Sequence, residues 1–343
     1  MIKKNLIISA LLFSILIITG GYYVFYRNEV LPDHLCLKKN QQADFKIERL
    51  GKYPSVEYNM GSAEIIIKDN GNEILKFRID NIVNPSHYHP LEIHKCNVYV
   101  MKGFNFDYTK SKALPGFSVE LWKYQYNGSG ERIFELAGED DRGKAEIYYS
   151  NDFRIPTDEK YLVLEKGYLG KDDYALVIKD LNTTQDVFEF STKSVAQQYP
   201  DRVGSFGMLE WTNDSRYFWG DIFDGAYDLA YFRIDVQNWK AEIFEAADGS
   251  MGGMPLNINT GYVPIQPGLV WTGDVESTQE LKQKEMQEGK KSSLYLYSLF
   301  TKEKVLIETT DEPQFFFKPK WLSDTELQYT LPSGETKIFT IPK

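Results

Sequence analysis

Short apolar runs separated by turn-forming residues make up most of this chain. Runs of this kind, rich in aromatic and β-branched residues, predict β-strands rather than helices. Four pairs of runs flank short polar or glycine-containing segments and therefore predict β-hairpins. The paired strands are expected at residues 64–68 and 73–79, 119–126 and 131–136, 174–181 and 186–190, and 294–299 and 304–308.

One segment of the domain, residues 276–287, has a helical pattern, but its large apolar residues are only Leu281 and Met286. A helix with so few apolar positions cannot bury a continuous face. We therefore expect a solvated insertion between strands. The aromatic content of 15% favours sheet elsewhere.

The N-terminus holds a long stretch, residues 6–26, without a charged residue, preceded by Lys3 and Lys4. As a helix it would be about 31 Å long, close to the roughly 30 Å of a bilayer core. The two lysines predict a cytoplasmic N-terminus. We expect a transmembrane anchor at residues 1–30, a juxtamembrane linker at 31–60 and an extracytoplasmic domain at 61–343, held at the cell membrane. A cleaved signal peptide is the alternative and gives the same compartment.

An aromatic residue followed by aspartate recurs about every 55 positions, each time near a predicted strand. The residues that mark these copies are Asp158, Trp211 with Asp214, Trp271 with Asp274, and Trp321 with Asp324. An aspartate in such a turn can accept a hydrogen bond from the backbone two residues further on. Repeats of this length are typical of β-propellers, where each four-stranded sheet forms one blade.

The copies resemble the repeats of the periplasmic Tol-system propeller and of the propellers of prolyl oligopeptidase and dipeptidyl-peptidase relatives. The matching residues are Thr212, Asp214, Arg216 and Tyr217 in one copy and Asp158, Lys160 and Leu162 in another. The family's proline is absent from three copies, and its glycine after the aspartate is absent from all four. The resemblance spans residues 140–343.

The fold class that follows is all-β and propeller-like, with five or six blades after one transmembrane helix. Circular propellers complete the last blade with an N-terminal strand, and residues 64–79 are the candidate for it. An open pair of β-sheets or an irregular β-domain is the alternative. No G-x-S-x-G motif occurs, so the peptidase activity of the resembled families is not expected here.

Both cysteines and all four histidines lie between residues 34 and 96. In an oxidising compartment Cys36 and Cys96 would form a disulfide. A zinc or copper site at His87, His89 and His94 with a thiolate is an alternative, and unpaired cysteines are another. No cofactor is expected.

The net charge of −10 and the absence of a basic patch argue against nucleic-acid binding. Residues 216–232 mix aromatic residues with Asp221, Asp224 and Asp228. Such a segment either packs as an ordinary hairpin or binds a sugar beside a carboxylate pair. We expect a non-catalytic interaction module for an envelope protein, a peptide or a glycan. The alternative is a glycan-active enzyme with a carboxylate pair at the propeller centre.

Overall fold

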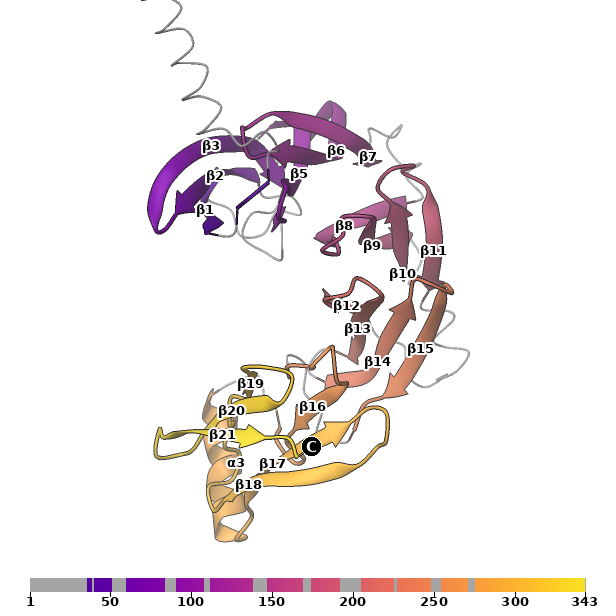
Figure 1. Ribbon diagram of the computed structural model, residues 1–343. Helices are drawn as coiled ribbons and strands as arrows, with labels where there is room; N and C mark the ends of the chain where they lie inside the picture. The colour runs from indigo at the N-terminus through magenta and orange to yellow at the C-terminus, as the bar shows by residue number, and fades with distance from the viewer. Residues whose placement is uncertain are drawn as a thin grey trace, which may run out of the picture. The chain divides into compact units, whose positions relative to one another are not determined.

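The computed structural model describes residues 36–38, 40–50, 60–83, 91–107, 112–137, 147–168, 174–191, 205–224, 227–247, 254–270 and 275–342 (Figure 1). The chain divides into two compact units, Met1–Gly143 and Lys144–Lys343. Within the described ranges no helix combines the length and the apolar composition that crossing a bilayer requires. The anchor expected at residues 1–30 lies outside those ranges.

The described part of the first unit is one antiparallel sheet, sheet A, with the strand order β1-β2-β3-β5-β6-β7 and β4 paired to β5. Its strands are β1 (Gln41–Leu50), β2 (Met60–Asp69), β3 (Asn72–Val83), β4 (Leu91–Ile93), β5 (Asn97–Asp107), β6 (Lys112–Gln125) and β7 (Gly130–Ala137). β1 lies inside the segment expected to be a linker. A strand forms in this segment because Ala43 and Ile47, which lie on one face of it, both pack against the apolar core of the sheet.

The β2–β3 hairpin confirms the first of the four predicted hairpins. Its turn contains Asn70 and Gly71, both with positive φ, as a two-residue type I′ turn requires. Ile65, Ile67 and Ile79 on its strands are almost completely buried. The β6–β7 hairpin confirms the second prediction.

The described part of the second unit contains four antiparallel sheets, each built from strands that are consecutive in the chain. Sheet B holds β8 (Ile147–Arg154), β9 (Tyr161–Tyr168), β10 (Tyr174–Asp180) and β11 (Asp186–Ser191). Sheet C holds β12 (Ser205–Trp211), β13 (Tyr217–Asp224), β14 (Tyr227–Asp235) and β15 (Lys240–Glu245). The all-β prediction is therefore confirmed.

The other two sheets have three described strands each. Sheet D holds β16 (Tyr262–Ile265), β17 (Ser292–Ser298) and β18 (Lys304–Thr310), and sheet E holds β19 (Lys320–Trp321), β20 (Glu326–Thr330) and β21 (Thr336–Thr340). The pairings β10–β11 and β17–β18 confirm the remaining two predicted hairpins. The number of blades stays a prediction.

The predicted helix is present as α3 (Val275–Gln287), between β16 and β17. Met286 is 56% exposed, as expected for a solvated insertion. One side chain of α3 is nevertheless buried: the Glu285 carboxylate accepts a 2.7 Å hydrogen bond from Gln314 Nε2. This contact ties the helix to the segment that follows β18.

Three of the four aspartates that mark the repeat lie in the turn between the first and second described strands of a sheet. Asp158 lies between β8 and β9, Asp214 between β12 and β13, and Asp324 between β19 and β20. Trp211 and Trp321 end the strands before two of these turns. The fourth marker, Trp271 with Asp274, lies outside the described residues.

Sheet D has a turn of this kind that the sequence reading missed. Thr212 N donates to Tyr217 O at 2.8 Å in sheet C, and Asn257 N donates to Tyr262 O at 2.9 Å before β16 in the same five-residue pattern. The Asn257 side chain caps the turn by accepting from the backbone N–H groups of Asn259 and Thr260. The capping residue of this turn is an asparagine at the position of Thr212, so a search for aspartate passes over it.

Turns of neighbouring sheets contact one another. Thr157 Oγ1 in the β8–β9 turn lies 3.0 Å from Ser215 Oγ in the β12–β13 turn. In sheets D and E, Asn259 Nδ2 donates to Asp324 Oδ1 at 2.8 Å. The recurring motif therefore joins adjacent sheets at equivalent positions.

Residues 64–79 lie in β2 and β3 of sheet A and not in sheet E, the last described sheet of the chain. β2 pairs along its length with β1 on one side and with β3 on the other, so it has no free backbone donors and acceptors for a third strand. β3 pairs with β5 only at Ile82 and Lys102, outside this range. The closure expected from β2 is therefore wrong.

Candidate functional site

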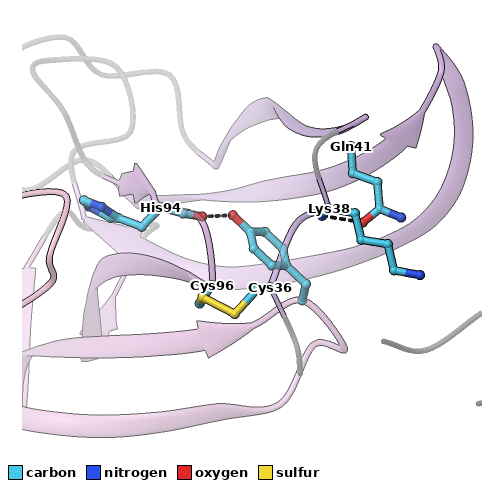
Figure 2. Close-up of a disulfide and its surroundings, with 6 residues drawn as sticks. Cys36, Lys38, Gln41, His94 and Cys96 are labelled. Carbon is cyan, nitrogen blue, oxygen red and sulfur yellow. Dashed lines mark hydrogen bonds between the residues drawn. A yellow bond between two sulfur atoms is a disulfide. The ribbon is translucent and has the colours of Figure 1, made fainter. Parts of the chain in front are cut away.

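A disulfide joins Cys36, just before β1, to Cys96 in the β4–β5 turn (Figure 2). Leu37 N donates to Lys95 O at 2.7 Å, so the backbone on either side of the bond is paired as well. Lys38 N donates to Gln41 Oε1 at 3.0 Å and closes the turn into β1. These contacts hold the entry to sheet A against its interior strands.

The predicted metal site has one described member. His94 Nε2 lies 3.2 Å from Glu92 Oε2, and its ring meets Tyr99 edge-on at 5.6 Å. His87 and His89 lie outside the described residues. No group of three His, Cys, Asp or Glu side chains suited to a metal occurs within the described ranges.

Two aspartates of the segment 216–232 come together in sheet C. Asp221 on β13 and Asp228 on β14 are only 9% and 6% exposed, and they are close enough for the charge of Asp221 to act on Asp228. Tyr231, the cross-strand partner of Asp221, donates from Oη to Asp228 Oδ2 at 2.6 Å. Asp221 also lies over Gly207, where a Cβ atom would come within 1.9 Å of Asp221 Oδ1.

Burial raises the pKa of Asp221, and it raises the pKa of Asp228 to about 7. The neighbouring Asp221 charge adds to the rise at Asp228. Two neighbouring buried carboxyl groups resist carrying two negative charges together. A glycosidase pair holds a sugar between its carboxyl groups, and the burial of both Asp221 and Asp228 does not favour that role.

A second cluster, in sheet A, was not found from the sequence. Four aromatic rings form a continuous series across β3, β5 and β6, which we call the aromatic row: Phe77, Tyr124, Trp122 and Phe104. The centroids of successive rings are 6.5 Å, 6.1 Å and 6.1 Å apart. Tyr124 is buried, while the other three rings are half-buried. The row thus keeps apolar surface open to solvent.

Lys102 on β5 lies within the aromatic row. Its Nζ atom donates to Tyr124 Oη at 2.7 Å. The distances from Nζ to the ring centroids are 4.9 Å for Trp122, 5.4 Å for Tyr124 and 5.6 Å for Phe104. Ring faces attract cations at these distances.

Burial lowers the pKa of Lys102, although the charges of Asp80 and Glu120 oppose the shift. Burial also raises the pKa of Tyr124 to about 12, with a contribution from Asp80. Tyr124 therefore stays a neutral hydrogen-bond partner at neutral pH. The ammonium of Lys102 is less well stabilised here than in water.

The sequence does carry a signal for this cluster. Val98, Val100, Lys102 and Phe104 alternate along β5, and Glu120, Trp122 and Tyr124 alternate along β6. Alternate residues share one face of a strand. The pairing of Lys102 with Glu120 and of Val100 with Trp122 then sets the two series side by side. That register was not predictable from either strand alone.

Comparison with known proteins gives no family. No protein-family model matches this chain, and no curated protein matches it. Among solved structures, it is similar to prolyl endopeptidases described for inter-domain dynamics, with 8% identity and a TM-score of 0.44, covering 88% of this chain and 39% of that one. It is also similar to an acylaminoacyl peptidase of Pyrococcus horikoshii, with 11% identity, a TM-score of 0.45 and coverage of 90% and 45%.

A third similar structure is the Dos1 propeller, with 9% identity, a TM-score of 0.41 and coverage of 86% of this chain and 67% of that one. The chain spans less than half the length of both peptidases, 39% of one and 45% of the other. At such identities and TM-scores these neighbours carry no argument about this chain.

Proposed function

We propose that this chain is a membrane-attached, extracytoplasmic binding module that holds a glycan on the aromatic row of sheet A. The observation that carries the proposal is the row itself, in which four successive rings are 6.5 Å, 6.1 Å and 6.1 Å apart and three of the four are half-buried. Apolar surface left open beside fixed polar groups marks binding sites. Pyranose rings present flat C–H faces that suit such a surface.

Two features support the location. The Cys36–Cys96 disulfide is the state of cysteines in an oxidising compartment. The uncharged residues 6–26 have the length and flanking lysines of a signal-anchor.

We further propose that the second unit is propeller-like and serves as scaffold or second docking surface. Sheets of consecutive antiparallel strands, joined through equivalent turns, support this. The alternative of a carboxylate-pair enzyme loses its best pair, because Asp221 and Asp228 are buried against each other. We therefore favour a module without catalysis.

The test measures retention of the full chain, purified in detergent micelles, on immobilised neutral and acidic polysaccharides. The variant is Trp122→Ala, and the matched control is Phe45→Ala, which removes a 46% exposed ring of β1 outside the aromatic row. We expect Trp122→Ala to weaken binding at least about tenfold, equivalent to about 1.4 kcal/mol, and Phe45→Ala to bind as the unaltered chain does. Equal binding by Trp122→Ala would disprove the proposal.

A further inference from the structure

Lys102 is a half-buried cation without an ion-pair partner among the described residues. Its one hydrogen bond goes to the neutral hydroxyl of Tyr124. An ammonium group has three N–H donors, so two remain for a ligand. Since the surrounding rings accept no conventional hydrogen bond, these donors are the strongest unused polar groups in the aromatic row.

The two carboxylates whose charges act on Lys102 have hydrogen bonds to other side chains. Glu120 is the direct cross-strand partner of Lys102. Its Oε2 nevertheless accepts from Trp122 Nε1 at 2.8 Å, and its Oε1 accepts from Arg132 Nη1 at 3.0 Å. The other acidic neighbour, Asp80, accepts from Arg78 Nε at 2.7 Å. Each acid is thus paired with an arginine, and neither forms an ion pair with Lys102, although both charges raise its pKa.

We infer that the ligand of the aromatic row is an acidic sugar, whose carboxylate is held by Lys102 while its ring lies against Trp122 and Phe104. This inference rests on the proposed function and specifies its ligand. A carboxylate would use the free N–H donors of Lys102 in charge-assisted hydrogen bonds, which are about twice as strong as neutral ones. A neutral sugar would leave the cation unpaired in a partly desolvated site, at a cost.

The acidic sugar is recognised through direct contact with the site and is not attracted from a distance. The chain carries a net charge of −10, so its overall field does not attract an anion. Selectivity for acidic sugars must therefore come from Lys102 itself. A lysine elsewhere on the same sheet should not supply it.

The experiment uses the full chain in detergent micelles and titrates it calorimetrically with oligogalacturonate and with its methyl ester of the same length, which has no charge. We expect the acid to bind at least about tenfold more tightly than the ester. Lys102→Met should bring the two affinities together, whereas Lys102→Arg should restore part of the difference. The control is Lys76→Met, which removes a 54% exposed lysine of β3 and should change neither affinity.

A second readout follows Lys102 directly. With lysine labelled at Cε, nuclear magnetic resonance should show the pKa of Lys102 rising when the acid is bound and staying constant with the ester. Equal affinity for acid and ester, with Trp122→Ala weakening both, would overturn this inference and leave the proposed function standing. Absence of binding by either sugar, with no change at Lys102, would overturn both.

Discussion

The aromatic ring of Tyr124 lies directly over Gly130, its cross-strand partner, and a Cβ atom at Gly130 would come within 2.5 Å of ring atom Cε1. Glycine at this position leaves the space that the ring occupies. The ring in turn carries the hydroxyl to which Lys102 donates. The aromatic row therefore depends on a residue with no side chain.

Gly130→Ala should displace the Tyr124 ring and lower the free energy of unfolding by about 1 to 3 kcal/mol, the usual cost of overpacking. Chemical denaturation of the full chain in detergent micelles measures it. Removing the ring as well, in Tyr124→Ala with Gly130→Ala, should make the two effects non-additive. A Gly130→Ala protein as stable as the unaltered chain would contradict the packing described here.

Stability should fall as the pH rises from about 4 to about 7, because burial raises the pKa values of Asp221 and Asp228. Burial raises the pKa of Asp228 from 3.8 to about 7, so the folded protein holds a proton that the unfolded chain releases. The stabilisation is fully present below the pKa of the unfolded chain. It is lost as the pH rises through the pKa of the folded protein, by at most about 1.4 kcal/mol per pH unit. Denaturation at several pH values should show Asp228→Asn gaining stability relative to the unaltered chain as pH rises.

Asp235→Asn is the control for the pH experiment. Burial of Asp235 is outweighed by the hydrogen bonds from Arg216 and from Gln237 N, which hold its pKa below the usual value. Its carboxylate is therefore already ionised throughout the window in which Asp228 titrates. Asp235→Asn should leave the slope unchanged, and a slope that survives in Asp228→Asn would assign the effect to another group.

Reduction of the Cys36–Cys96 disulfide should destabilise the first unit by about 4 kcal/mol, since the bond links residues 60 positions apart. The double variant Cys36→Ala with Cys96→Ala should lose the same amount without reductant. Because the chain has only two cysteines, reductant can act on no other bond. Denaturation curves of the two preparations that differ from each other would contradict this account.

The aspartates of the repeat should differ in their contribution to stability. Asp214 Oδ1 accepts from Thr212 Oγ1 at 2.6 Å and from Arg216 N at 3.1 Å, so Asp214→Ala should cost about 1 kcal/mol. Asp324 Oδ1 accepts one bond from Asn259 Nδ2 at an exposed site. Asp324→Ala should cost less than about 0.5 kcal/mol. Denaturation of both variants side by side measures the two losses in free energy of unfolding. Equal losses would contradict this prediction.

Much of the local structure was predictable from the sequence. All four hairpins, the helix at α3 and the turn positions of three aspartates are present. The predicted backbone contact two residues on is present at Asp158, which accepts from Lys160 N at 3.2 Å, and at Asp214. It is absent at Asp324, where Ser323 Oγ accepts from Thr325 N in its place. These features depend on residues close together in the chain.

The amino-acid sequence by itself determined where the four hairpins and the helix lie, because side-chain alternation and turn chemistry act over a few neighbouring residues. Only the tertiary structure decided which strands pair and in what register. A bulge between Ile222 and Phe223 brings Asp228 to Asp221, and the β5–β6 register sets Lys102 beside Trp122. Contacts between strands depend on register, and a shift of one residue would turn each of these side chains to the opposite face.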